Sequence, residues 1–205
     1  MTDPFNRQIF IGMGCFLETL KISATETGHS VEFDILPQGE NGPIAVVKFS
    51  KVATLDPLAQ FITTRHSDKE AYSDRIIEED KISELSNHVA IIADQERVEA
   101  LRQITWDALD VEMLTPRTLK ESVDLMRIGK REINANPDGI EMREPILDAL
   151  YNVDLLTRET LLDKDHSGFR AKMNAMQRTC FATPAFAVLT TPGNTRHDQI
   201  NAGRD

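Results

Sequence analysis

Two short runs that alternate between apolar and polar residues, SVEFDIL (30–36) and PIAVVKFS (43–50), lie on either side of the turn-rich segment PQGENG. Strict alternation is typical of a strand with one buried face, so the two runs predict a hairpin or a pair of neighbouring strands. Before them, residues 5–27 carry apolar side chains at helical spacing, and Gly28 stands where a helix C-cap belongs. The stripe on that helix consists of Ile9, Met13, Phe16, Leu17, Leu20 and Ala24.

The rest of the chain repeats this succession with longer helices. The run HVAIIAD (88–94) predicts a buried strand, and its last residue, Asp94, is placed to cap a long helix. The expected buried face of that helix consists of Val98, Leu101, Thr105 and Leu109. Short amphipathic turns are expected around 58–62 and 82–85.

The last third of the chain opens with a predicted helix over 115–132, starting at the Thr115-Pro116 pair. TPAFAVLTT (183–191) predicts the last strand, and the residues after it begin a final helix. Helices and strands interleave without a GxGxxG motif or regular βαβ spacing, so we expect an α+β fold with a mixed sheet.

The charge balance limits the classes of partner. The 205 residues carry a formal net charge of −10 and are 40% hydrophobic and 27% charged, as in an ordinary globular protein. An acidic surface repels phosphate backbones and anionic lipids, so neither nucleic acid nor a membrane is expected as a partner. No apolar run is long enough for a membrane helix, and no signal segment opens the chain. Cys15 and Cys180 lack metal-ligand spacing and are expected as reduced, packed thiols of a cytoplasmic protein.

Several possible motifs have simpler explanations. The GxG in IGMGCFL (11–17) lies within a helical stripe, which favours close helix packing over a dinucleotide turn. DKDHSG (163–168) resembles a calcium loop but has Asn174 where a bidentate Glu is needed, so a solvated turn is expected. The five histidines show no metal-ligand pairing and are expected to be surface or structural residues.

The predicted helix over 115–132 is rich in charge, which usually indicates a salt-bridged solvent face. Its charged residues are Arg117, Lys120, Arg127, Lys130 and Arg131 beside Glu121, Asp124 and Glu132. Its apolar residues Leu119, Val123, Met126 and Ile133 are too spread for one narrow stripe. We therefore expect a helix that lies over another part of the protein and is not part of a core.

The stretch TTRHSDKEAY (63–72) brings Arg65, Ser67 and Lys69 close together after a short apolar run. Arginine offers a rigid fork for phosphate, serine a short donor and lysine a point charge. Their i, i+2, i+4 spacing lets all three converge only if the chain leaves helical geometry. The stretch is either a phosphate clamp or the solvated end of a helix.

The same residues resemble a known family. Arg65-His66-Ser67-Asp68-Lys69 is similar to the arginine-x-serine-x-arginine motif of the nitroreductase superfamily, with lysine in the last position. ESVDLMRIGKREINANPDGI (121–140) and TPAFAVLTTPGNTRHDQINAGRD (183–205) resemble the Acg-type, nitroreductase-like branch. The resemblance implies that Arg65, Ser67 and Lys69 hold the phosphate and ribityl chain of FMN. It implies no catalytic side chain and no metal ligand.

Members of the Acg-type branch look like two fused halves that imitate the flavin-binding dimer. The resemblance then implies that 1–52 is the end of the first half and 56–205 most of the second, with a lid-like helical insertion at about 115–145. It also implies truncation at both ends, without the last helix and strand of the second half. The family's proline-, glutamine- and tryptophan-containing motif that lines the flavin ring has no match, and Trp106 lies in the middle of a predicted helix.

Three hypotheses about function follow from this resemblance. The first is an FMN-binding oxidoreductase that uses NAD(P)H to reduce nitro compounds or quinones. The second is a non-catalytic protein that binds or sequesters flavin under a lid. The third is a fragment that binds no flavin alone and associates with a second copy or a missing segment.

Overall fold

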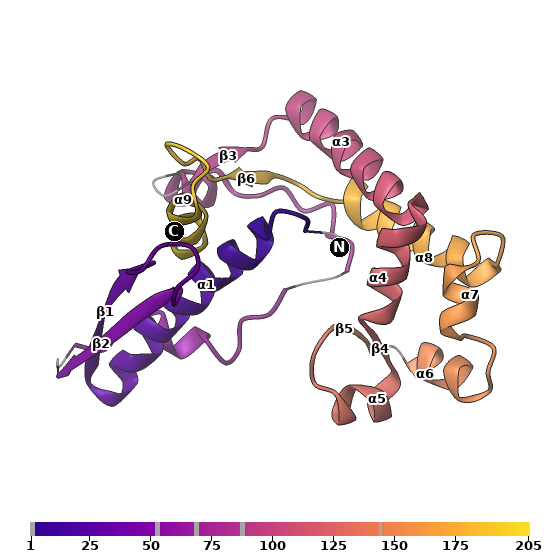
Figure 1. Ribbon diagram of the computed structural model, residues 1–205. Helices are drawn as coiled ribbons and strands as arrows, with labels where there is room; N and C mark the ends of the chain where they lie inside the picture. Colours follow the sequence, from indigo (N-terminus) through magenta and orange to yellow (C-terminus); the bar gives the residue numbers. More distant parts are fainter. Residues whose placement is uncertain (1–2, 52–53, 68–69, 87–88, 144) are drawn as a thin grey trace. The chain divides into compact units, whose positions relative to one another are not determined.

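A computed structural model of the chain describes all residues except 1–2, 52–53, 68–69, 87–88 and 144. The fold is α+β, as predicted, and its strands form three two-stranded sheets within the described residues. The chain divides into two compact units. Unit 1 comprises Lys69–Glu84 and Ile91–Phe186, and unit 2 comprises Asp3–Asp68, Leu85–Ala90 and Ala187–Asp205. Figure 1 labels the elements of both.

Unit 2 contains the predicted first helix and hairpin. The elements are α1 (Arg7–Ala24), the 3-10 turn η1 (Thr25–Thr27), β1 (His29–Ile35), β2 (Ala45–Lys51), the 3-10 turn η2 (Ala59–Phe61) and α9 (Arg196–Arg204). β1 and β2 pair antiparallel with Val31 opposite Phe49 and Phe33 opposite Val47. Gly28 ends η1 at φ 73°, in the left-handed region that favours glycine. The hairpin and the glycine cap are therefore confirmed.

The helices α1 and α9 cross at two glycines. A Cβ on Gly14 would overlap the carbonyl oxygen of Ile200, and a Cβ on Gly203 would overlap the carbonyl oxygen of Ile11. Ile200 is completely buried in a cluster with Phe10, Leu17 and Leu36. The GxG sequence thus serves close helix packing, as expected, although only its second glycine, Gly14, lies at the crossing.

The buried face of α1 differs from the expected stripe. Phe10, Gly14, Leu17 and Ala24 are buried, whereas Ile9 and Phe16 are more than half exposed. The physical reason is that Gly14 lets the backbone of α9 approach, so the face centred on the glycine is covered. An apolar stripe read from side-chain volume alone gives too little weight to this glycine.

Two arginines of α9 fasten its ends to the rest of unit 2. The Arg196 guanidinium lies 4.5 Å from the centre of the Phe10 ring and donates to the Phe5 carbonyl oxygen. Arg204 pairs with Glu18 at 3.2 Å and lies over the Phe33 ring. The final helix has no complete apolar stripe. It packs through the buried Ile200 and these two arginines.

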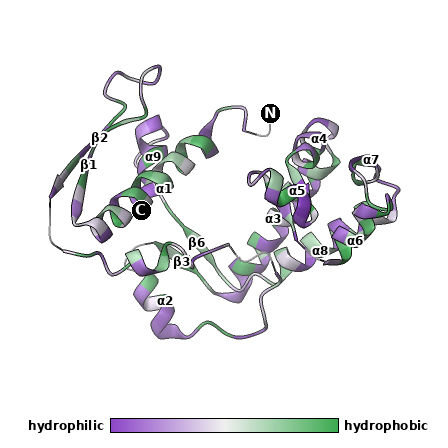
Figure 2. Ribbon diagram, turned by 90° about the horizontal axis from the view of Figure 1, so that it is seen from below, coloured by the Kyte–Doolittle hydropathy of each residue, from purple (hydrophilic) through white to green (hydrophobic). Residues whose placement is uncertain are grey.

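The remaining elements lie wholly or partly in unit 1. They are α2 (Glu79–Leu85), β3 (Ala90–Ile92), α3 (Gln95–Leu114), α4 (Pro116–Asp124), β4 (Met126–Ile128), α5 (Gly129–Ala135), β5 (Ile140–Met142), α6 (Pro145–Asn152), α7 (Arg158–Leu162), α8 (Ser167–Phe181) and β6 (Phe186–Val188). β3 pairs with β6, and β4 pairs with β5 in parallel. In Figure 2 β6 is coloured as hydrophobic, in keeping with the predicted strand, and α2, where a short amphipathic turn was predicted, is mostly hydrophilic.

The Asp94 cap is confirmed, because its side chain accepts a hydrogen bond from the Arg97 amide at the start of α3. The expected buried face of α3 is only partly right. Val98 is buried and Leu101 and Leu109 are half-buried, but Thr105 is exposed.

The prediction of one helix over 115–132 is wrong. α4 ends at Asp124, β4 follows, and α5 starts at Gly129 with φ 77°. A Cβ on Gly129 would overlap the Asp148 carboxylate, so this position needs glycine for both its space and its backbone angle.

The apolar residues of this segment are core residues and do not lie over another part of the protein. Leu119 is 2% exposed, Val123 0% and Met126 3%. Together with Ile128, Leu161 and Phe169 they belong to the main core cluster of unit 1. The spacing looked too spread for one helix because it changes from a helical period in α4 to a strand period in β4.

Candidate functional site

The described part of the predicted phosphate anchor, Arg65 and Ser67, lies just after η2 in unit 2. The Arg65 amide donates to the Phe61 carbonyl oxygen at 2.7 Å, and residues 65–67 then have no regular secondary structure. Arg65 and Ser67 are both exposed. Lys69 lies outside the described residues, so the structure places two of the three predicted anchors and leaves their convergence with the third a prediction.

The chemistry of this segment suits a phosphate better than an aromatic ring. The side chains of Arg65 and Ser67 supply N–H and O–H donors to one short stretch of chain, as a phosphate needs. Residues 63–67 are all exposed, and Phe61 is more than half exposed. The segment alone therefore offers donors for a phosphate but does not enclose a flavin ring.

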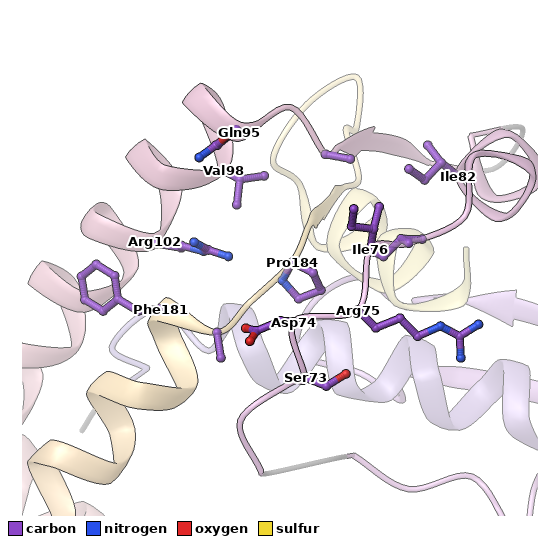
Figure 3. A pocket seen from close by; sticks show the side chains of 13 residues that line it. Ser73, Asp74, Arg75, Ile76, Ile82, Gln95, Val98, Arg102, Phe181 and Pro184 are labelled. Carbon is purple, nitrogen blue, oxygen red and sulfur yellow. The ribbon is translucent and has the colours of Figure 1, made fainter.

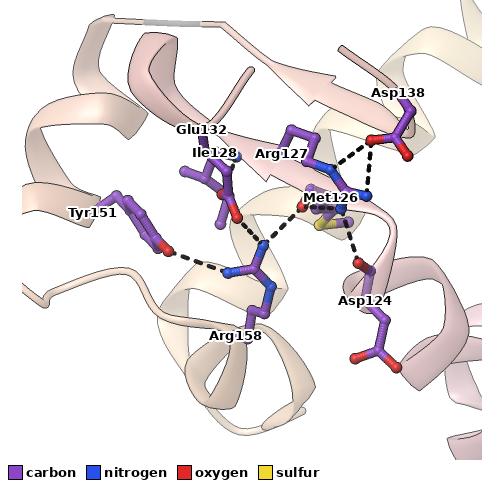
Figure 4. Close-up of polar contacts among 8 residues, drawn as sticks. All are labelled: Asp124, Met126, Arg127, Ile128, Glu132, Asp138, Tyr151 and Arg158. Carbon is purple, nitrogen blue, oxygen red and sulfur yellow. Dashed lines mark hydrogen bonds and ion pairs between the residues drawn. The ribbon is translucent and has the colours of Figure 1, made fainter. Parts of the chain in front are cut away.

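The charged segment after α4 forms a polar cluster inside unit 1 (Figure 4). The Arg158 guanidinium donates to the Glu132 carboxylate, to the Tyr151 hydroxyl at 3.1 Å and to the Met126 carbonyl oxygen at 2.9 Å. Glu132 also accepts from the Ile128 amide at 2.8 Å. These contacts connect α5, α6 and α7 to β4.

Only part of the predicted solvent face is therefore on the surface. Lys120 and Asp124 form an exposed i, i+4 pair at 2.6 Å, as expected for such a helix. In contrast, the Arg127 side chain is 16% exposed and donates to the carboxylate of Asp138. The expectation of a solvated face is wrong for Arg127 and Glu132, whereas Lys130 and Arg131 are exposed as predicted.

The electrostatics of this cluster point to a structural role. Burial alone would raise the pKa of Glu132, but the hydrogen bond from the Ile128 amide and the nearby Arg158 outweigh it, and this pKa lies below its ordinary value. The pKa of Arg158 is raised, chiefly by its hydrogen bond to Glu132. Both groups stay charged near neutral pH, and each polar end is held by a partner, so the pair is a clamp and not an acid–base site.

A hollow of about 390 Å³ opens beside α3, entirely within unit 1 (Figure 3). Gln95, Val98 and Arg102 face it from α3, because their i, i+3, i+7 spacing puts them on one helical stripe. The residues before α2 and the chain around the end of α8 complete the lining, which consists otherwise of Ser73, Asp74, Arg75, Ile76, Ile77, Ile82, Ala93, Phe181, Ala182 and Pro184.

Arg102 is the most constrained polar side chain of this hollow. Its Nε donates to the Thr183 carbonyl oxygen at 2.8 Å, and its Nη1 lies 3.2 Å from Glu99. Its side chain is 24% exposed. Arg102 was not predicted from the sequence, because Thr183, whose carbonyl oxygen holds it in place, lies 81 positions away in the chain. Its seven-residue spacing from Gln95 was the only available signal.

Lys172 and Cys180 are two further reactive groups of α8, both half-buried. Burial lowers the pKa of Lys172 and raises the pKa of the Cys180 thiol. Among the described residues, Lys172 Nζ finds no hydrogen-bond partner and lies 5.0 Å from the centre of the Phe169 ring. Neither side chain lines the hollow beside α3. Cys15, expected to be packed, is exposed on α1.

The DKDHSG turn joins α7 to α8. The His166 Nδ1 accepts from the Gly168 amide at 3.0 Å and so caps α8, and Asp163 accepts from the Asp165 amide. In the part of the chain that the structure describes, no three His, Cys, Asp or Glu side chains gather as a metal site. Of the other histidines, His88 lies outside the described residues. No helix among the described residues is both long and apolar enough to cross a membrane.

Comparison with known proteins gives no relative: no family model, no curated protein and no solved structure matches this chain.

Proposed function

We propose that this chain is an FMN-binding, nitroreductase-like oxidoreductase. Arg65, Ser67 and Lys69 would hold the phosphate and ribityl chain, and the bound flavin would carry the electrons from NAD(P)H to a nitro compound or a quinone. The assignment rests on the resemblance of the segments 65–72, 121–140 and 183–205 to the Acg-type branch. The proposal also assigns the chain the two fused, pseudo-dimeric halves of that branch, at 1–52 and 56–205, and the nitroreductase-like sheet of that branch.

The observation that supports this proposal most is the backbone at Arg65. The three anchors are spaced two residues apart, which in a helix would point neighbouring members in nearly opposite directions. In an extended chain the same spacing puts them on one face. Residues 65–67 are non-helical and exposed, which supports such an arrangement for Arg65 and Ser67.

The first experiment is to purify the full chain, add FMN and measure the visible absorbance of protein separated from free flavin. We expect flavin to remain with the protein and to bleach with dithionite. The double variant Arg65→Ala/Ser67→Ala should lose the flavin. Arg75→Ala is the matched control, because Arg75 is an equally exposed arginine paired with Glu78. A chain that retains no FMN contradicts the proposal.

Turnover of NADH or NADPH with nitrofurazone or a quinone then separates an oxidoreductase from a non-catalytic flavin binder. Bound flavin with no oxidation of either cofactor would identify the second. Removing 115–145 to open a lid is not a usable test, because Leu119, Val123 and Met126 are part of the core of unit 1. An associating fragment would instead show a mass above that of one chain in light scattering.

A further inference from the structure

The hollow beside α3 leaves an unusual side chain in solvent. Ile76 is 87% exposed, the highest value among the exposed large hydrophobic residues of the described chain. It lines the hollow together with the buried Val98. Covering an exposed isoleucine and the apolar surface beside it with a small apolar group is favourable, because it removes apolar area from water.

The polar residues of the hollow set its charge preference. Arg102 donates from its Nε to Thr183 and from its Nη1 to Glu99, which leaves its Nη2 able to donate to a carboxylate. Arg75 is engaged by Glu78 at 2.7 Å and extends away from Arg102 in Figure 3. Arg102, whose charge is partly offset by its ion pair with Glu99, suits a single carboxylate better than a phosphate dianion.

Asp74 lies across the hollow from Arg102 and points into the same space (Figure 3). A carboxylate there repels a plain organic anion but attracts an ammonium group. The hollow thus combines a positive end, a negative end and apolar walls in one unit of the chain.

We propose that this hollow binds a small zwitterion with an apolar body, namely a free α-amino acid with a hydrophobic side chain. Arg102 receives its carboxylate and Asp74 its ammonium group. The side chain of the amino acid covers Ile76 and Val98. This site is separate from the proposed flavin anchor and does not depend on it.

Binding of phenylalanine to the full chain, measured by calorimetry or saturation-transfer NMR, tests the proposal. N-acetylphenylalanine lacks the ammonium group and phenylalaninamide lacks the carboxylate. We expect each to bind about 10-fold more weakly than phenylalanine, as the loss of one charged hydrogen bond predicts. Absence of phenylalanine binding at about 10 mM, or equal affinity for all three compounds, would overturn the proposal.

Two variants test which residue binds the ammonium group of the ligand and which binds its carboxylate. Asp74→Asn should weaken phenylalanine binding about 10-fold and should not weaken N-acetylphenylalanine binding, because that anion loses only a repulsion. Arg102→Lys, which keeps the charge but loses the fork, should weaken phenylalanine binding and leave phenylalaninamide unchanged. Because Asp74 is exposed, its variant keeps the test valid even if Arg102→Lys does not fold.

Two controls complete the design. Asp107→Asn removes an exposed carboxylate of α3 that does not line the hollow, and should change no affinity. Ile76→Ser should weaken phenylalanine binding severalfold, whereas Ile104→Ser, at an exposed isoleucine of α3 that does not line the hollow, should not. Unchanged affinity in both Asp74→Asn and Ile76→Ser would place the ligand elsewhere and refute the site.

Discussion

The two units hold their helices together in different ways. In unit 2, α1 and α9 meet backbone to backbone at Gly14 and Gly203, around the fully buried Ile200. In unit 1, larger apolar side chains form the core, and the Arg158–Glu132 pair joins α7 to α5. We therefore expect the stability of unit 2 to fall when a side chain at the helix crossing is enlarged. The stability of unit 1 should fall when a core side chain is shortened or a paired charge is removed.

The sequence offers a way to observe one unit alone. Trp106, the single tryptophan, lies on α3 in unit 1, so its fluorescence reports on unit 1. Amide hydrogen exchange along α1 reports on unit 2. These two signals let each substitution be assigned to the unit it affects.

The largest effect is expected from Gly14→Ala in unit 2. The new methyl group would overlap the backbone of α9, which cannot move aside like a flexible side chain. We expect a loss of about 3 kcal/mol or more, seen as faster exchange along α1 with little change in Trp106 fluorescence. Gly12→Ala is the matched control, because a Cβ there meets nothing within 4 Å, and it should stabilise α1 by about 0.5 kcal/mol. Equal effects of the two changes would refute the crossing.

Leu119→Ala tests the opposite sensitivity in unit 1. Removing this buried side chain from α4 should cost about 3 kcal/mol through lost burial and the cavity left behind. Urea unfolding followed by Trp106 fluorescence measures the change. Ile104→Ala, on the exposed side of α3, should cost much less. If Leu119→Ala is as mild as this control, α4 is not part of the core and a lid-like role regains support.

Arg158→Met should have a smaller effect, again confined to unit 1. It leaves Glu132 without its charged partner, but the side chains are 30% and 22% exposed, so water compensates part of the loss. We expect about 1–2 kcal/mol from the midpoint of urea unfolding. Lys120→Met breaks the exposed pair with Asp124 and should cost less than about 0.5 kcal/mol. A reversed order would show that the clamp contributes no stability.

The smallest effect is the acid dependence of the same clamp. Because folding lowers the pKa of Glu132 below its ordinary 4.5, its contribution is present above that value and is lost as the pH falls through the folded-state pKa. The stability difference between the native chain and Glu132→Gln should therefore be constant near neutral pH and shrink below about pH 4.5. Asp107→Asn, at an exposed site, serves as the control. A difference that grows on acidification would contradict the direction of the shift.

Local signals in the sequence were enough for part of the fold. The alternation around Val31 and Phe33 predicted the hairpin, and the capping residues Gly28 and Asp94 marked the correct ends. These features are determined by residues that are near in sequence, so a local sequence pattern is enough to predict them. The α+β class followed from the same patterns.

Other features depend on contacts between distant residues and were missed for that reason. Gly129 interrupts the expected helix with a φ of 77° where it lies against Asp148, and Arg102 is fixed by Thr183. Neither partner is near in sequence. At the proposed flavin anchor, the residue types Arg65 and Ser67 could be read from the sequence, but their non-helical backbone could not.

The most direct test of the central claim is a comparison of FMN with riboflavin, which has the same ring and ribityl chain but no phosphate. Flavin fluorescence titrations of the full chain give both dissociation constants at fixed ionic strength. A clamp built from Arg65, Ser67 and Lys69 predicts that FMN binds about 100-fold more tightly and that Arg65→Ala removes most of this preference. Equal affinity for the two flavins, or a preference unchanged in Arg65→Ala, would contradict the assignment.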